Sequence, residues 1–267
     1  WKKGREEAAM RGASNIEEHH RQSVLKKAQG MHLAAPLFSL EEILIKPHLV
    51  APPPQVEPGN DFVAQDQTNL SVPYLPQDST FSSFYRTDTL TISEALSAGA
   101  HLAILGDSGM GKSVALAYIA SLIARKDQEM STLQDAIPFL LHVADLSLSN
   151  ADLKDILDPI SEFLTEEASL FNATRLPKFT RLSFNSGRAL LLLDGLDEIP
   201  QEEIERVVNY LTTLLTEYPN IRIITTASIE FLSTLTALGF ASLSLKGWNG
   251  LERQEFLNKW GKLWENY

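Results

Sequence analysis

The sequence predicts an α/β fold in three layers, with helices on both faces of a parallel sheet. From about residue 95 onward, short apolar segments of strand length alternate with longer segments of helical periodicity. The short segments are apolar throughout, as expected of strands that are buried on both faces between helical layers. A helical and proline-rich N-terminal extension precedes this region.

Five strands and the helices between them are expected. The strands cover residues 101–107, 138–146, 188–194, 221–227 and 240–245. The helices cover residues 91–99, 113–126, 151–170, 178–186, 201–217, 229–238 and 250–264. The helix over 201–217 has the clearest pattern, because its apolar residues recur at helical spacing along one face.

The first 94 residues are expected to lie outside this fold. Residues 1–60 read as a helical segment followed by a proline-rich linker, and residues 61–94 as an irregular extension that crosses the domain surface like a strap. The α/β domain then covers 95–267. The helix over 1–34 is polar and is expected to be partly exposed or to act as a tether. Its histidines, His19, His20 and His32, are interpreted as solvated rather than metal-binding, because no Cys or well-spaced acid accompanies them.

Composition excludes several classes of protein. A net charge of −11 and a pI near 5.0 argue against nucleic-acid binding, which needs a basic surface. The chain has no Cys, so a disulfide framework and a Cys-based zinc site are excluded. A cytoplasmic location is expected. The chain begins at Trp1 rather than Met, which indicates a fragment, and "WKKGR" resembles the cytoplasmic flank of a membrane helix. A solvated basic helix end is the favoured alternative.

The segment "GDSGMGKS", Gly106 to Ser113, follows the first expected strand directly and precedes a helix. This is the pattern of a phosphate-binding loop, G-x-x-x-x-G-K-[ST], in the context that it requires. The glycines let backbone N–H groups converge on a phosphate at the helix N-terminus. Lys112 is expected to reach the β- and γ-phosphates and the Ser113 hydroxyl to bind Mg²⁺. The predicted nucleotide-binding residues are Gly106, Asp107, Ser108, Gly109, Met110, Gly111, Lys112 and Ser113.

Acidic residues follow the third expected strand, in "LLLLDGLDEIP". Asp194 stands at the carboxyl end of the strand, where it fits the Walker B role of holding Mg²⁺ beside Ser113. Asp197 and Glu198 lie on the next turn, and one of them could orient or deprotonate the attacking water. The alternative for these two is that they cap the helix that begins near 201.

The two segments together resemble the NACHT family of signal-transduction NTPases, in the STAND and AAA+-like P-loop group, of the bacterial type. A Gly after the Walker B Asp, followed by "LDE", is the usual variant of that family. The resemblance extends over about 95–264, through "RIITTAS" and "LSLKGWNGLERQEFLNKW". It implies a five-stranded parallel sheet in the order 5-1-4-3-2 and a truncated helical lid.

One departure from the family bears on activity. Thr225, Thr226, Ala227 and Ser228 stand where the family carries an Arg that senses the γ-phosphate. Thr225 or Thr226 could hydrogen-bond a phosphate instead, although a plain strand-end hydroxyl is the alternative.

The leading hypothesis is an ATP-binding, Mg²⁺-dependent and slowly hydrolysing switch that controls self-association or contacts with other domains. The second hypothesis is a degenerate NTPase fold that serves as a protein-interaction scaffold. A metabolic P-loop kinase or a DNA-linked ATPase fits less well, because the chain is acidic and has no recognisable acceptor-substrate motif.

Overall fold

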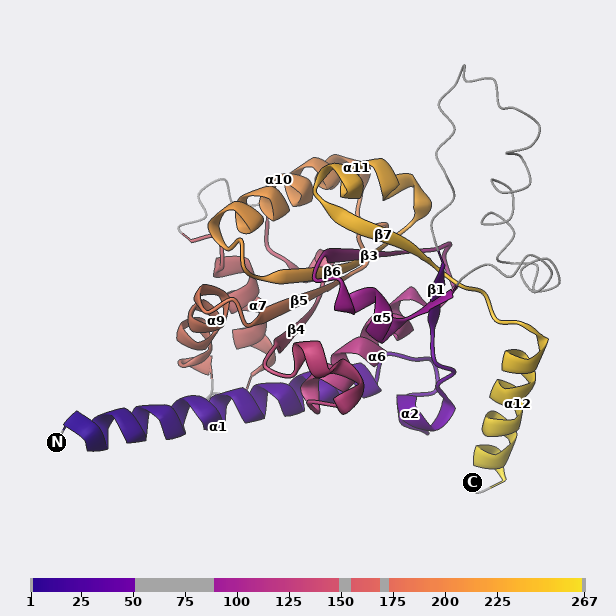
Figure 1. The fold of residues 1–267 in the computed structure, drawn as a ribbon, viewed down its shortest axis with the longest axis horizontal. Coiled ribbons are helices and arrows are strands. Elements are labelled where there is room, and N and C mark those ends of the chain that lie inside the picture. Colours follow the sequence, from indigo (N-terminus) through magenta and orange to yellow (C-terminus); the bar gives the residue numbers. More distant parts are fainter. Residues whose placement is uncertain (1, 51–88, 149–154, 169–172, 266–267) are drawn as a thin grey trace, which may run out of the picture. The chain divides into compact units, whose positions relative to one another are not determined.

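The computed structural model describes residues 2–50, 89–148, 155–168 and 173–265 (Figure 1). Residues 51–88 lie outside these ranges. They include residues 51–60 of the predicted proline-rich linker and most of the strap predicted over 61–94. The chain divides into two compact units. The first unit comprises Trp1–Ala28 and Leu116–Thr226, and the second comprises Gln29–Ala115 and Ala227–Tyr267.

Within the described residues, seven strands form a mixed sheet in the order β2-β1-β7-β3-β6-β5-β4. Their bounds are β1 His48–Val50, β2 Thr89–Thr91, β3 His101–Leu105, β4 Ile137–His142, β5 Ala189–Asp194, β6 Arg222–Ala227 and β7 Phe240–Leu245. In the first unit β4, β5 and β6 are parallel to one another, and in the second unit β3 is parallel to β7. The α/β class is therefore confirmed.

The prediction of a five-stranded, wholly parallel sheet is wrong, because β1 and β2 extend the sheet with antiparallel pairs. β1 pairs with β7 through Leu49↔Leu245, and the Lys246 N–H donates to the His48 carbonyl at 2.9 Å. β2 pairs with β1 in turn. Each of the two strands has only three residues, too few to show a periodicity, and both lie in sequence that reads as connector. Their pairing partners, which are distant in sequence, make them strands.

The described helices fall close to the expected segments, except that α7 is shorter than the helix predicted over 151–170: it begins at Asp158, and residues 155–157 before it are not helical. The described helices are α1 Lys2–Gln29, α2 Leu40–Ile43, α5 Ile92–Ser97, α6 Lys112–Ala124, α7 Asp158–Glu167, α9 Leu176–Asn185, α10 Gln201–Glu217, α11 Leu232–Ala237 and α12 Gly250–Trp264, with short 3₁₀ turns at Gln128–Leu133, Val143–Asp145 and Ile229–Phe231. In the second unit α12 packs through Phe256, Trp260 and Leu263 on a small core that contains Phe38. Among the described residues, none of the helices combines the length and the apolar character that a membrane span requires.

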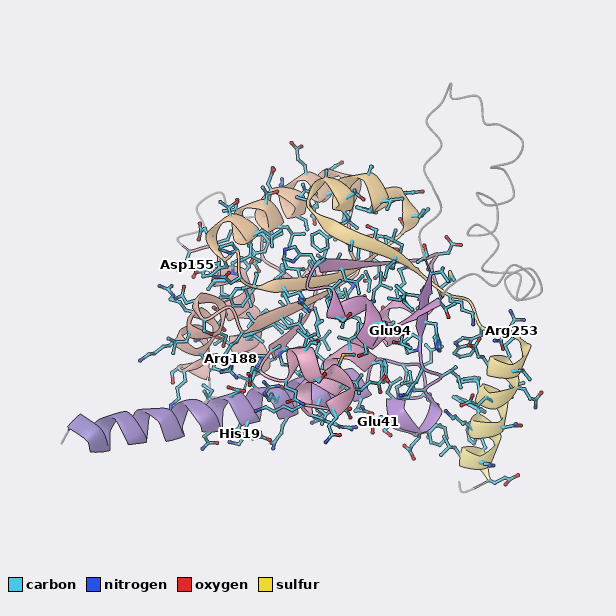
Figure 2. The ribbon with its side chains drawn as sticks, in the orientation of Figure 1. His19, Glu41, Glu94, Asp155, Arg188 and Arg253 are labelled. Atoms are coloured by element: carbon cyan, nitrogen blue, oxygen red, sulfur yellow. The ribbon has the colours of Figure 1, made fainter. Side chains whose placement is uncertain are left out.

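Helix α1 belongs to the core of the first unit and is not merely a tether. Ile16, Val24 and Ala28 are buried on its inner face. His20 and Arg21 are buried as well, so the prediction of a solvated histidine is wrong for His20, whereas His19 is exposed (Figure 2). A buried imidazole needs hydrogen-bond partners that a helical pattern cannot reveal. His20 has one, because its Nε2 donates to the Pro138 carbonyl at 2.8 Å.

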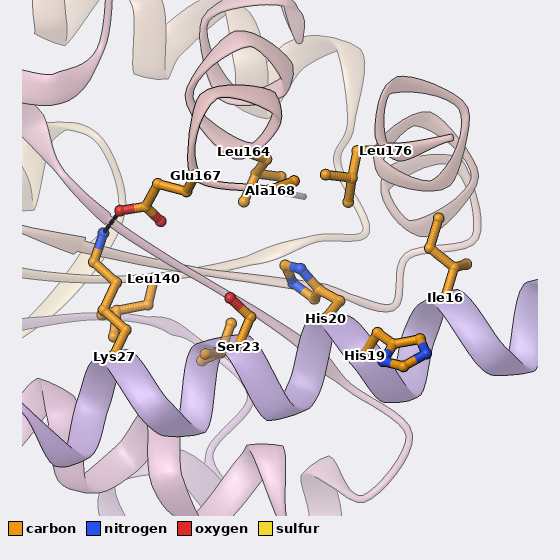
Figure 3. A pocket seen from close by; sticks show the side chains of 11 residues that line it. Ile16, His19, His20, Ser23, Lys27, Leu140, Leu164, Glu167, Ala168 and Leu176 are labelled. Carbon is orange, nitrogen blue, oxygen red and sulfur yellow. Dashed lines mark hydrogen bonds and ion pairs between the residues drawn. The ribbon is translucent and has the colours of Figure 1, made fainter. Parts of the chain in front are cut away.

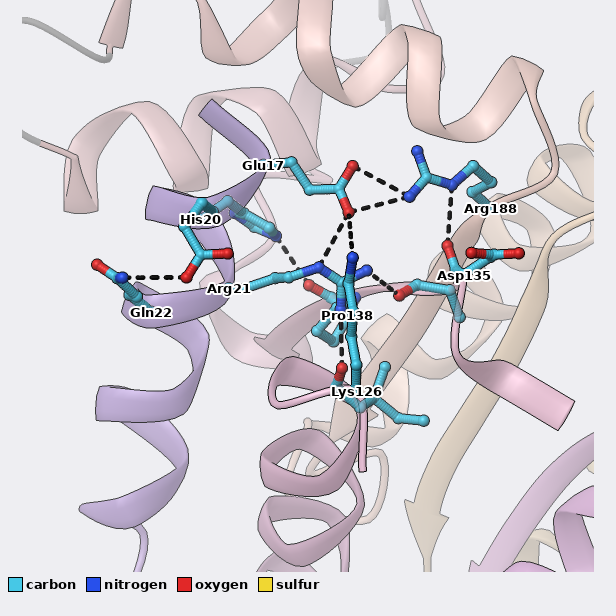
Figure 4. A network of polar contacts seen from close by, with 11 residues as sticks. Glu17, His20, Arg21, Gln22, Lys126, Asp135, Pro138 and Arg188 are labelled. Atoms are coloured by element: carbon cyan, nitrogen blue, oxygen red, sulfur yellow. Dashed lines mark hydrogen bonds and ion pairs between the residues drawn. The ribbon is translucent and has the colours of Figure 1, made fainter. Parts of the chain in front are cut away.

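Arg21 joins α1 to the rest of the first unit (Figure 4). It is only 2% exposed. Its guanidinium donates to the Ile123 carbonyl at 2.7 Å, to the Ala136 carbonyl at 2.6 Å and to Glu17 at 3.0 Å. Glu17 also accepts from Arg188, which precedes β5, at 2.9 Å. One buried charge thus connects α1 to the end of α6 and to the residue before β4.

These contacts also set the ionisation of Glu17. Burial alone would raise the pKa of its carboxyl, but the hydrogen bond from Arg21 and the charges of Arg188 and Arg21 outweigh burial and hold the pKa below the usual value of 4.5. Glu17 therefore stays ionised in the folded protein.

A pocket of about 190 Å³ lies in the first unit, between α1 and the helices α7 and α9 (Figure 3). His20 and Leu140 lie along its inner wall, and an ion pair at 3.0 Å between Lys27 and Glu167 stands at one end. The His20 ring packs on Phe139 and Phe179, with centroids 4.9 and 5.3 Å away. The ring therefore sits in apolar surroundings beside a small opening.

Burial lowers the pKa of His20 from 6.5 to about 4, with a smaller contribution from the charge of Arg21. Between these two values the unfolded chain binds a proton that the folded protein does not. Stability therefore falls as the pH is lowered through this range. We expect the free energy of unfolding to drop by about 2 kcal/mol on this account between about pH 7 and about pH 4.5.

Urea unfolding at both pH values measures this effect. His20→Gln removes the titrating group. Between the two pH values, the free energy of unfolding of the wild type should therefore fall by about 2 kcal/mol more than that of this variant. His19→Gln, which changes the exposed neighbour, is the matched control and should follow the wild type. Equal losses for the wild type and His20→Gln would contradict the prediction.

Candidate functional site

The predicted phosphate-binding loop lies in the second unit, between the end of β3 at Leu105 and the start of α6 at Lys112. The Gly106 N–H donates to the Ala227 carbonyl at 3.1 Å, which fixes the start of the loop against β6's last residue. Gly109 and Gly111 have φ values of +80° and +91°. Only glycine adopts this left-handed region without strain, so both glycines are required by the path of the loop.

The Lys112 side chain folds back along this loop. It is 9% exposed, and its ammonium donates to the carbonyls of Gly106 at 2.9 Å and Asp107 at 3.1 Å. Asp107, Ser108 and Gly109 are exposed. The loop thus presents a buried cation and the N-terminus of a helix of 13 residues at an exposed turn. This combination is typical of anion-binding sites, and of phosphate sites above all.

The predicted metal-binding acid lies in the first unit. Asp194 ends β5 and is only 5% exposed. The Thr226 hydroxyl on β6 donates to its Oδ1 at 2.5 Å and accepts from the Gly195 N–H at 3.0 Å. One threonine therefore orients the carboxylate and also fixes the turn that follows it.

The neighbouring Thr225 is fully buried, and its hydroxyl donates to the Leu193 carbonyl at 3.0 Å. Both threonines thus donate their hydroxyl protons to β5. Their predicted contact with phosphate stays a prediction.

Asp197 and Glu198 follow on the turn after β5. The Glu198 N–H donates to the Gly195 carbonyl at 3.0 Å, which closes the turn. The alternative was that one of these acids caps α10. The N-cap residue of α10 is Pro200, so neither acid occupies that position. The Glu198 side chain is 63% exposed, so water can reach its carboxylate.

One polar residue near these acids was missed by sequence reasoning. His142 ends β4, and in the parallel register it pairs with Asp194 at the end of β5. Its Nε2 lies 3.3 Å from Oε2 of Glu198. A polar residue at the carboxyl end of an apolar strand is the signal that could have found it, because such ends carry ligand-binding residues in parallel sheets.

The first unit thus brings His142, Asp194, Glu198 and Thr226 together, and the second unit holds the loop from Gly106 to Lys112 with Ser113 on the first turn of α6. Within the described part of the chain, no group of three or more His, Cys, Asp or Glu side chains forms a metal cage. Mg²⁺ is usually bound by one or two carboxylates together with phosphates and water. A single oriented carboxylate such as Asp194 fits that ion.

A glycine-rich loop between a strand and a helix, with an acid at the end of a buried parallel strand, defines a nucleotide-binding α/β protein of the P-loop type. The family model of the NACHT domain matches residues 100–263, more than half of the chain. The chain therefore belongs to the NACHT domain family, whose members are nucleotide-binding NTPase modules in signalling. A comparison with curated proteins gave no match.

Proposed function

We propose that this NACHT domain binds ATP with Mg²⁺, hydrolyses it slowly and acts as a nucleotide-dependent switch for the assembly of a larger protein. The observation that carries the proposal is the loop geometry: Lys112 is buried, and its ammonium is held against the loop by the carbonyls of Gly106 and Asp107. Phosphate oxygens would replace these carbonyls as its partners. ATP is favoured over GTP on the family resemblance.

The roles of the residues follow from their chemistry. Backbone N–H groups of residues 106–113 would bind the phosphates, and Lys112 would neutralise charge on the β- and γ-phosphates. Ser113 and Asp194 would hold Mg²⁺, which when bound neutralises charge between these phosphates. Thr226 keeps the Asp194 carboxylate in one orientation through its 2.5 Å hydrogen bond. Glu198, with Asp197 beside it, would accept a proton from the attacking water or orient it.

A second candidate function is a scaffold that binds nucleotide only structurally. One observation favours it: Thr225 and Thr226 replace the phosphate-sensing Arg, and both donate their hydroxyl protons to β5. A scaffold would show no Mg²⁺-dependent turnover. A kinase would need a second substrate, whereas the proposed switch hydrolyses ATP alone.

Glu198→Gln tests the hydrolytic proposal. The amide keeps the size of the side chain but cannot accept a proton, so we expect ATP hydrolysis to slow about 100-fold. Calorimetry should show that this variant binds ATP within about 2-fold of the wild type, whose Kd we expect in the micromolar range. Hydrolysis is measured as phosphate release with Mg²⁺.

The matched control is Glu202→Gln, which removes an exposed acid from the first turn of α10. It should hydrolyse ATP at the wild-type rate. Hydrolysis by Glu198→Gln at the wild-type rate would show that the assignment of Glu198 is wrong. Nucleotide binding without any turnover in the wild type would favour the scaffold.

A further inference from the structure

We infer that His142 is a positioning residue for the hydrolytic reaction, and that it acts by holding the Glu198 carboxylate through a hydrogen bond from its ring. The inference rests on the proposed function, because Glu198 is the proposed base. It adds a residue from β4 that the phosphate-binding and acidic motifs do not contain. Three features of the first unit support it.

The first feature is the position of the ring proton. The Ala144 N–H donates to Nδ1 of His142 at 3.2 Å, so Nδ1 carries the lone pair. In the neutral ring the proton must then reside on Nε2. Nε2 is the atom that lies 3.3 Å from Oε2 of Glu198. The contact is therefore an N–H group donating to a carboxylate, and the backbone of residues 143–145 fixes the tautomer that makes it possible.

The second feature is the space that Gly195 leaves for the ring. A Cβ atom at Gly195 would lie 2.9 Å from Cδ2 of His142 and nearer still to Cε1 and Nε2. Real Cβ atoms do not approach other atoms so closely, so the ring occupies the place of a side chain. Gly195 also has a φ of +77°, which favours glycine independently. The turn after Asp194 is thus built around the imidazole.

The third feature is the geometry that brings the two residues together. His142 and Asp194 are register partners at the carboxyl ends of β4 and β5. The hydrogen bond from the Glu198 N–H to the Gly195 carbonyl turns the chain back, so that Glu198 returns toward the end of β4. The Glu198 side chain is 63% exposed and that of His142 is 31% exposed. An exposed glutamate on a turn samples several rotamers, and one hydrogen bond restricts it to the rotamer that faces the strand ends.

This arrangement gives His142 a definite effect on the reaction. The bond engages Oε2, and Oε1 can accept a proton from water. A base that is held in one place contributes more to the rate than one that must first be oriented. His142 does not need to touch the nucleotide, so its loss should lower kcat and leave binding nearly unchanged.

Kinetics of two variants test this effect. His142→Ala removes the donor, and we expect kcat for ATP hydrolysis to fall about 10-fold while the Kd for ATP stays within about 2-fold. His142→Gln places an amide N–H near the position of Nε2, so it should recover most of the rate. In the Glu198→Gln background, His142→Ala should lower the rate less than about 2-fold further, because the two residues act as a unit. Equal losses in the Ala and Gln variants, or additive losses in the double variant, would overturn the inference.

A measurement without nucleotide separates this inference from the proposed function. ¹⁵N-detected NMR of the histidine rings should show His142 as the Nε2–H tautomer, and its Nε2 signal should shift in Glu198→Gln but not in Glu202→Gln. The inference is overturned if His142 is the Nδ1–H tautomer, or if its Nε2 signal does not change in Glu198→Gln. Either result overturns it whatever the rate of ATP hydrolysis. If the wild type hydrolyses no ATP although the Nε2 signal responds, the proposed hydrolysis is wrong and the catalytic part of the inference falls with it.

Discussion

Lys112→Ala should weaken ATP binding at least about 100-fold, the largest effect on binding that we expect from a single substitution. The variant loses the only side-chain ammonium that is described within the loop from Gly106 to Ser113. Charge-assisted hydrogen bonds each contribute about 1.5–3 kcal/mol, and two such bonds to phosphate correspond to about 100-fold or more in affinity. The measurement is calorimetry with ATP and Mg²⁺.

Two further variants serve to interpret the affinity measured for Lys112→Ala. Lys178→Ala removes an exposed lysine from α9 and serves as the matched control, because it changes the net charge equally and should bind ATP like the wild type. Lys112→Met keeps the buried aliphatic stem and should bind as weakly as the Ala variant. Binding by Lys112→Met at the wild-type affinity would show that the ammonium does not contact phosphate. The Lys112 ammonium would then have only a structural role, namely its hydrogen bonds to the carbonyls of Gly106 and Asp107.

Arg21→Met should lower the free energy of unfolding by about 3 kcal/mol or more, the largest loss of stability that we expect from a single substitution, because it removes a buried charge from its partners. Methionine fills much of the same space, so the loss reflects hydrogen bonds rather than a cavity. The carbonyls of Ile123 and Ala136 each lose a charged donor within 2.7 Å. Glu17 loses one of its two arginine partners, and a buried acceptor left unsatisfied costs about 1–3 kcal/mol.

Urea unfolding monitored by circular dichroism measures this loss. Arg206→Met, an exposed site on α10, is the control and should stay within about 0.5 kcal/mol of the wild type. Since α1 connects to β4 and β5 through this network, removal of residues 1–28 should destabilise the first unit as well. A stability of Arg21→Met equal to that of the control would mean that α1 is an independent tether, as its polar sequence suggested.

The features that the sequence predicts best are those that depend on residues adjacent along the chain. The loop from Gly106 to Ser113 is recognisable because its glycines, Lys112 and the flanking strand and helix are adjacent along the chain. The same holds for Asp194 after four leucines, and for the apolar strands β3 to β7. Each of these elements follows from local periodicity or from a motif of fewer than about ten residues.

The contacts that orient these residues depend on the tertiary structure. Thr226 and Asp194 are separated by 32 positions, and His142 and Glu198 by 56. His20 and Pro138 are separated by 118 positions, and Arg21 and Ala136 by 115. A helical or strand period gives no information on such pairs, so α1 looked like a polar tether and His142 like an ordinary strand residue.

The sequence by itself thus predicted the α/β fold class, the candidate phosphate-binding loop and the candidate acids, because these depend on residue type and spacing within short segments. Only the tertiary structure decided that β1 and β2 extend the sheet, that α1 is part of the core, and that His142 contacts Glu198. In each case the feature depends on a hydrogen bond or strand pairing between a polar or backbone group and a partner far along the chain. Buried groups must find such partners, and only the folded chain shows which ones they find.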